Sequence, residues 1–87
     1  MYSLVIKEHL GKVFGKLSKK NPRQLDIIKT KIQQILENPL HFKPLRAPLQ
    51  NKRRVHIDKS FVLVYSVDEN TKTVVLEEYD HHDNIYK

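Results

Sequence analysis

The spacing of apolar residues changes from a strand period to a helix period near the start of the chain. Residues 2–7, YSLVIK, alternate in the manner of a strand. After residue 8, apolar side chains recur at the i, i+3, i+4, i+7 spacing of one helix face, at Leu10, Val13, Phe14 and Leu17. The sequence therefore predicts a first strand followed directly by an amphipathic helix.

A second helix is predicted to begin at NPRQ, residues 21–24. Asn21 suits the N-cap, Pro22 suits the first helical position, and Gln24 occupies the reciprocal capping position. An apolar stripe follows, formed by Leu25, Ile28, Ile32, Ile35 and Leu36. Pro39 predicts the end of this helix, because proline disfavours helical geometry in the residue before it.

The second half of the chain predicts a loop and three strands. Residues 38–51 contain three of the four prolines and predict an extended loop that lies over the core through Leu40, Phe42 and Leu45. Strands are predicted at 53–58, 61–67 and 73–79, and the second of these is apolar on both faces, which favours a central position. The order βααβββ predicts an α+β fold, with a single, mostly antiparallel sheet and both helices packed on one face.

Composition limits the class of protein. A chain of 87 residues is expected to form one domain, spanning 1–87. It has no cysteine, which excludes disulfides and thiolate zinc sites, and we recognise neither a signal peptide nor a stretch long enough to span a membrane. We therefore expect a cytoplasmic protein with no membrane partner.

Charge is divided unevenly along the chain. Residues 1–67 contain fourteen Lys and Arg against four Asp and Glu, a net charge of +10, whereas residues 68–87 contain two against six, a net charge of −4. The basic part favours a polyanionic partner such as nucleic acid, although excess lysine also serves solubility alone.

The predicted strand at 53–58 places its charges on one face. Val55 and Ile57 can point into the core only if Arg54, His56 and Asp58 point to the opposite face, which we expect to be open. The nearby cations are dense enough to hold a phosphodiester backbone, but a merely solvated strand face fits the same alternation. No metal site is predicted at HHD, residues 81–83, because adjacent residues of an extended chain point in opposite directions.

Several segments together resemble the RelE/ParE toxin superfamily, and its RelE branch in particular. They are the loop NPLHFKPLRAPL, the run RRVHIDKSFVLVYSVDENTKTVVL and the ending HHDNIYK. The resemblance implies a type II toxin that cleaves mRNA in the ribosomal A site and is held inactive by an acidic, RelB-like antitoxin. It also implies a reaction without metal or cofactor, in which the RNA 2′-hydroxyl attacks the adjacent phosphate.

The resemblance assigns roles to individual residues. The implied catalytic residues match two basic positions of the second strand, a basic position near the C-terminus and a base-stacking tyrosine: Arg54, His56, His82 and Tyr86. Further contacts to RNA phosphates are expected from Lys52, Arg53, Lys59 and His81. Val62 stands where the family commonly has arginine, so we expect weaker catalysis, or catalysis that relies on histidines, which titrate near neutrality.

Two other functions remain open at this point. A ParE-like toxin that inhibits gyrase needs no phosphate site on the sheet. A degenerate toxin that only binds its antitoxin agrees with Val62 and with the acidic C-terminal part.

Overall fold

The computed structural model describes residues 1–46 and 51–85 and contains every predicted strand and helix. The elements in chain order are β1 (Ser3–Ile6), α1 (Glu8–Lys20), α2 (Pro22–Glu37), β2 (Lys52–Ile57), β3 (Phe61–Asp68), β4 (Thr73–His81) and α3 (His82–Ile85). The predicted order βααβββ is confirmed, and a one-turn helix, α3, is added after the last strand.

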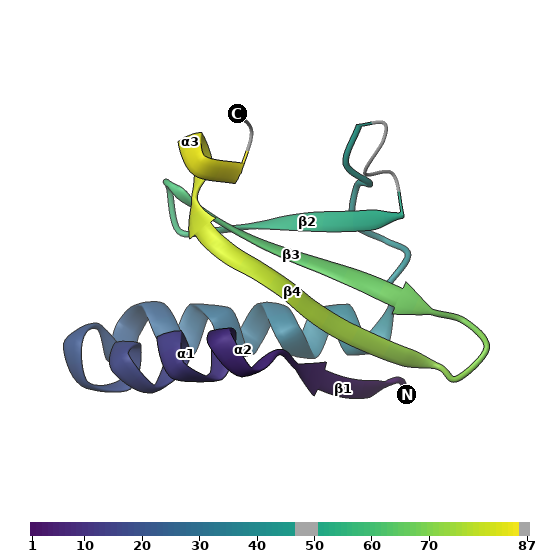
Figure 1. Cartoon of the computed structure of the whole chain (residues 1–87), viewed down its shortest axis with the longest axis horizontal. Coiled ribbons are helices and arrows are strands. Elements are labelled where there is room, and N and C mark those ends of the chain that lie inside the picture. The colour runs from purple at the N-terminus through teal and green to yellow at the C-terminus, as the bar shows by residue number, and fades with distance from the viewer. Residues whose placement is uncertain (47–50, 86–87) are drawn as a thin grey trace.

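The four strands form one mixed sheet in the order β1-β4-β3-β2. β1 runs parallel to β4, and the other two strand pairs are antiparallel. The strand predicted to be central, β3, lies between β4 and β2, which agrees with its apolar residues on both faces. Both long helices lie along one face of the sheet, and α3 lies on the opposite side (Figure 1).

The start of α2 is fixed by local chemistry, as the sequence predicts. The Asn21 side chain accepts a hydrogen bond from the Gln24 backbone N–H at 3.2 Å, and Pro22 occupies the first helical position. The Gln24 side chain accepts a hydrogen bond from the Asn21 amide and donates one to the hydroxyl of Tyr79 on β4. One capping residue therefore also ties the helix to the sheet.

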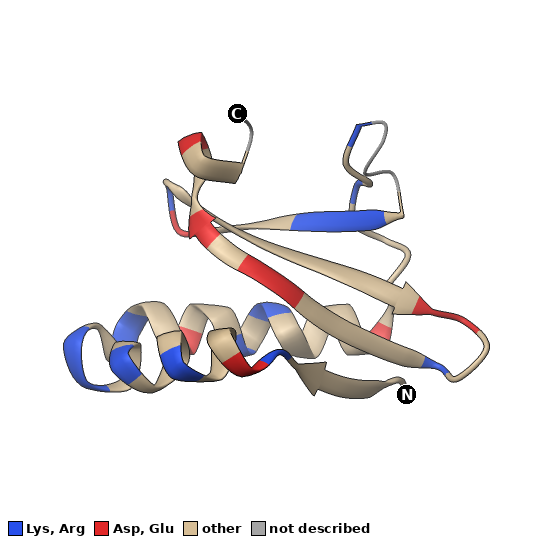
Figure 2. Ribbon diagram, in the orientation of Figure 1, with Lys and Arg blue, Asp and Glu red and all other residues tan. Residues whose placement is uncertain are grey.

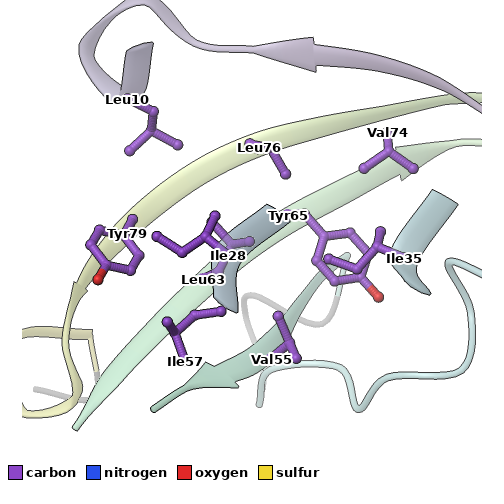
Figure 3. Packing of buried hydrophobic residues seen from close by; sticks show 10 residues of the cluster. All are labelled: Leu10, Ile28, Ile35, Val55, Ile57, Leu63, Tyr65, Val74, Leu76 and Tyr79. Atoms are coloured by element: carbon purple, nitrogen blue, oxygen red, sulfur yellow. The ribbon is translucent and has the colours of Figure 1, made fainter. Parts of the chain in front are cut away.

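The main core lies between the two long helices and the sheet. Figure 3 shows its buried side chains, which are Leu10, Ile28, Ile35, Val55, Ile57, Leu63, Tyr65, Val74, Leu76 and Tyr79. The alternation predicted for the basic strand is confirmed here, because Val55 and Ile57 of β2 face this core. Because side chains alternate along a strand, Arg54 and His56 lie on the opposite face of the sheet from Val55 and Ile57.

The loop after α2 only partly follows its prediction. Phe42 packs on the core as expected, and the Tyr65 hydroxyl donates a 2.6 Å hydrogen bond to the Pro39 carbonyl. Leu40, however, is 49% exposed, so its burial was predicted wrongly. Leu45 is buried as expected, but in a second core cluster on the other face of the sheet. The reason is that the loop turns around the edge of the sheet and pairs with β2 through a bridge between Pro44 and Arg53.

Candidate functional site

The face of the sheet opposite the long helices has a basic strand and an acidic strand. Pairing places His56 of β2 beside Val62 of β3, and Val62 beside Asp80 of β4. The next row in the same register is Arg54, Val64 and Glu78. Figure 2 shows the resulting division, with basic residues on β2, acidic residues on β4 and an uncharged stretch of β3 between them.

This face is less open than the sequence suggested. Val62 is fully buried and Val64 nearly so, in a small cluster with Leu45 from the loop, against which Ile85 of α3 packs. The expectation of an open face is therefore wrong over β3, because two segments distant in sequence close over its apolar side chains. The accessible polar groups lie around this cluster, on β2 and at the end of β4.

The structure brings His56 and His82 together. Their rings are stacked with centroids 6.2 Å apart and an interplanar angle of 21°. His82 is held in place by its backbone N–H, which donates a 2.7 Å hydrogen bond to the Ser60 carbonyl in the turn between β2 and β3. Its Nδ1 also lies 3.6 Å from a carboxylate oxygen of Asp83. Two residues that are 26 positions apart in the sequence thus form one histidine pair.

The chain turn after β4 is built by Asp80. Its carboxylate accepts hydrogen bonds from the His81 backbone N–H at 2.7 Å and from the Asn84 side chain at 3.0 Å. The His81 ring packs edge-on against Phe61, with centroids 5.6 Å apart, and its Nδ1 lies 3.7 Å from an Asp83 carboxylate oxygen. Asp80 therefore has a structural role close to the histidine pair.

Lys52 is engaged by the acidic strand. A register shift beside Val64 and Tyr65 leaves Glu77 as an extra residue of β4, and its carboxylate lies 2.5 Å from Lys7 Nζ and 4.0 Å from Lys52 Nζ. Burial opposes ionisation of Glu77, but the two lysines and a 2.6 Å hydrogen bond from Ser66 outweigh it and hold the pKa of Glu77 below its ordinary value. Part of the charge of Lys52 is therefore already neutralised.

The remaining predicted residues are dispersed. Arg54 is half-buried and lines a groove along the outer edge of β2 together with His56, whereas Lys59 is exposed in the turn after β2. Arg53 points toward the helix side, where its guanidinium donates hydrogen bonds to the carbonyls of Phe42, at 2.6 Å, and Leu40, at 3.4 Å. Tyr86 lies outside the described residues. The sequence alternation already indicated the side taken by Arg53, since Arg53 shares the parity of Val55 and Ile57.

Three residues of the same groove were missed from the sequence. Lys31 of α2 and His41 and Lys43 of the loop line it beside Arg54 and His56. No spacing rule links these positions, because they come together only through the pairing of the loop with β2.

Within the described residues, no helix has the length and apolar content needed to cross a membrane.

Solved structures that share this fold include toxins of type II toxin–antitoxin systems. The YoeB/ParE toxin from Agrobacterium tumefaciens matches 92% of this chain and 98% of its own, with a TM-score of 0.80 and 15% identity. A chain of the toxin–antitoxin complex RelBE2 from Mycobacterium tuberculosis matches 93% of this chain and 98% of its own, with a TM-score of 0.74 and 25% identity. The fold is that of the RelE-like toxins.

Sequence comparison places the chain more narrowly. A protein of Methanocaldococcus jannaschii that is named as a candidate toxin, RelE4, is 54% identical over 87 residues, which cover 100% of this chain and 93% of that protein. The family described as the ParE toxin of the type II toxin–antitoxin system parDE matches residues 3–86. The chain therefore belongs to this family of type II toxins, and the predicted RelE/ParE superfamily is confirmed.

Proposed function

We propose that this toxin is a cytoplasmic, ribosome-dependent endoribonuclease that cleaves mRNA in the ribosomal A site. The observation that supports the proposal is the stacked pair of His56 and His82, with Arg54 two residues before His56 on the same face of β2. Ring centroids 6.2 Å apart put both imidazoles within reach of one phosphodiester. These three residues are among the four that the resemblance to RelE-type toxins implies to be catalytic, the fourth being Tyr86.

In the proposed reaction the two histidines transfer protons without a metal ion. One imidazole takes the proton of the ribose 2′-hydroxyl, and the freed oxygen attacks the adjacent phosphorus. The bond from phosphorus to the 5′-oxygen breaks, and the other imidazole, in its protonated form, donates a proton to that oxygen. The products are a 2′,3′-cyclic phosphate and a 5′-hydroxyl.

Arg54 is proposed to stabilise the negative charge that develops on the phosphorane. Val62 supplies no charge at the centre of this face, and Glu78 lies two strands from Arg54, about 10 Å across the sheet at ordinary strand spacing. We therefore expect slower cleavage than a site with a third cation achieves. Tyr86 as a base-stacking residue, and Lys52, Lys59 and His81 as phosphate contacts, remain predictions of this proposal.

The test is primer extension on a defined mRNA, with and without programmed ribosomes. Cuts that require ribosomes are expected from the wild type, and Arg54→Ala and His82→Ala are each expected to slow cleavage by about 100-fold or more. Arg23→Ala, which removes an exposed arginine at the start of α2, serves as the control and is expected to cleave normally. Undiminished cleavage by Arg54→Ala and His82→Ala would remove the assigned roles, and intact mRNA in every reaction would remove the function.

Gyrase inhibition is the second candidate, because the matching family model is named for ParE. It predicts intact mRNA together with loss of DNA supercoiling when the purified protein is added to gyrase. A toxin that affects neither ribosomes nor gyrase is expected only if the chain is a degenerate binder of its antitoxin.

We propose that an antitoxin partner binds at the outer edge of β1. This strand is the terminal strand of the sheet, and its Leu4, Val5 and Ile6 are 36%, 47% and 41% exposed. Beside it lies a groove of about 570 Å³, lined largely by apolar side chains that include Leu4, Ile6 and Phe14. An exposed edge next to an apolar groove suits an amphipathic segment, and the basic charge of residues 1–67 favours an acidic one.

Co-purification with a co-expressed acidic, RelB-like antitoxin tests this surface. Leu4→Gln/Ile6→Gln is expected to weaken the complex, while Leu40→Gln, which changes an exposed apolar residue of the loop after α2, serves as the comparison. Equal retention of the antitoxin by wild type and the double variant, both folded by circular dichroism, would exclude β1 as the docking site.

A further inference from the structure

A groove of about 560 Å³ follows the outer edge of β2, between α2 and the loop after it. Among the described residues, its polar lining is formed by cationic or histidine side chains, which are Lys31, His41, Lys43, Arg54 and His56. Phe42 and Val55 form the apolar part of its lining, and no carboxylate of residues 1–46 or 51–85 lines it. Such a composition is suited to an anion with an extended shape.

The cations are placed side by side by backbone pairing. The Arg54 backbone N–H donates a 3.2 Å hydrogen bond to the Lys43 carbonyl, next to the bridge between Pro44 and Arg53. In this antiparallel register Lys43 lies opposite Arg54. Like charges on directly opposite positions of a strand pair favour an anion that can contact both.

The loop wall of the groove is held rigidly. The Arg53 guanidinium and the Tyr65 hydroxyl donate hydrogen bonds to the carbonyls of Phe42 and Pro39, each at 2.6 Å. Phe42 packs edge-on against both Tyr65 and His41, with centroids 6.4 and 5.2 Å apart. His41 and Lys43 are thus positioned before any ligand arrives, which lowers the entropic cost of binding.

Lys31 and Lys43 differ in their surroundings from Lys7 and Lys52. Among the described residues, no carboxylate lies within 4.0 Å of either ammonium group, whereas Lys7 and Lys52 both lie beside Glu77. The charges of Lys31 and Lys43 are therefore available to a ligand, whereas the charges of Lys7 and Lys52 are partly neutralised by Glu77.

We propose that this groove binds the RNA phosphate backbone adjacent to the scissile phosphate. His56 belongs both to the groove and to the histidine pair, so a strand that leaves the cleavage site enters the groove directly. The inference rests on the proposed ribonuclease function and adds Lys31, His41 and Lys43 to the residues that contact RNA. The bound backbone belongs either to the mRNA or to ribosomal RNA.

The first arm of the test measures binding of a 2′-O-methylated, single-stranded RNA by fluorescence anisotropy at increasing salt. Lys31→Gln/Lys43→Gln is expected to reduce the slope of log affinity against log salt by about 1.4, because each phosphate contact to single strands contributes about 0.7. Lys16→Gln/Lys19→Gln on α1 makes the same change in net charge at two exposed positions and is expected to leave the slope nearly unchanged. Lys31→Arg/Lys43→Arg is expected to retain the wild-type slope.

The second arm measures steady-state cleavage on programmed ribosomes. If the groove holds mRNA, the glutamine variant loses oligonucleotide affinity, and the KM for programmed ribosomes rises by about tenfold with kcat retained, as expected for loss of uniform binding. If the groove holds ribosomal RNA, the KM for programmed ribosomes rises but the oligonucleotide affinity is retained. Unchanged slope and unchanged KM, relative to the Lys16→Gln/Lys19→Gln control, would overturn the proposal.

Two further outcomes separate this inference from the function on which it rests. A wild type that binds the oligonucleotide through Lys31 and Lys43 but never cleaves mRNA supports the groove and rejects the ribonuclease. A glutamine variant that loses only its antitoxin, with RNA binding and KM unchanged, identifies the groove as a protein-binding surface and rejects the inference.

Discussion

Replacing Tyr65 by phenylalanine tests how the loop after α2 is held. The Tyr65 side chain is fully buried, and its hydroxyl donates a 2.6 Å hydrogen bond to the carbonyl of Pro39, which is itself buried. Tyr65→Phe leaves that carbonyl without this partner. An unsatisfied buried acceptor costs about 1–3 kcal/mol, so we expect the free energy of unfolding to fall by about 2 kcal/mol.

For a domain of this size, each kcal/mol lowers the melting temperature by about 4–8 °C, so Tyr65→Phe is expected to lower it by about 8–16 °C. Urea unfolding gives the free energy directly. Amide hydrogen exchange gives a local reading, because the N–H groups of Leu45 and Arg54 bond across the pairing of the loop with β2 and are expected to exchange faster.

Tyr2→Phe is the matched control. The Tyr2 hydroxyl also donates a hydrogen bond, 2.7 Å to Glu69, but this bond is exposed, so its loss is expected to change stability by less than about 0.5 kcal/mol. Equal stability of Tyr65→Phe and the wild type, with unchanged exchange at Leu45 and Arg54, would refute the reasoning that this hydroxyl anchors the loop.

Three further predictions concern charge and titration. Glu77→Gln is expected to lower the free energy of unfolding at neutral pH by about 1–2 kcal/mol, because it removes the charged contact with Lys7. Since the pKa of Glu77 is held below its ordinary 4.5, the stability that its charge supplies is present above pH 4.5 and is lost on further acidification. Urea unfolding across acidic pH measures this loss. Burial raises the pKa of Tyr65 and of Tyr79 to about 12. Each phenol is therefore expected to contribute about 3 kcal/mol to the free energy of unfolding, which is fully present below pH 10 and is lost between pH 10 and 12. Circular dichroism and tyrosinate absorbance follow this loss. Val62→Arg buries a guanidinium at a fully buried position and is expected to lower the free energy of unfolding by about 3–5 kcal/mol without faster cleavage, as measured by urea unfolding and primer extension.

Each of these predictions has an outcome that contradicts it. An acid profile of Glu77→Gln that parallels the wild type removes the role of the carboxylate. Titration of Tyr65 and Tyr79 near pH 10 in the folded protein would show that burial does not shield their phenols. A stable Val62→Arg variant that cleaves mRNA faster shows that the face over β3 opens to admit a cation.

The elements predicted correctly from the sequence are those fixed by local chemistry. The start of α2 depends on Asn21 and Pro22, which act within one helical turn, and the faces of β2 follow from alternation along a single strand. The central position of β3 follows from its apolar residues on both faces. These signals need no knowledge of distant contacts.

The rest depends on contacts between distant segments. Leu45 and Ile85 cover Val62 only because the loop and α3 both reach the same side of β3. Lys31 and Lys43 line one groove for a similar reason, since a helix and a loop meet at the edge of the sheet. The family resemblance implied catalytic roles for His56 and His82, and no spacing in the chain indicates that their rings lie together.

The most direct test of the central claim is single-turnover cleavage of mRNA on programmed ribosomes by the wild type, His56→Gln and His82→Gln, with analysis of the RNA ends. The proposed reaction predicts fragments that end in a 2′,3′-cyclic phosphate and begin with a 5′-hydroxyl, and cleavage slowed by about 100-fold or more in each histidine variant. Fragments that begin with a 5′-phosphate, or variants that cleave at the wild-type rate, would contradict the assignment of His56 and His82 to proton transfer.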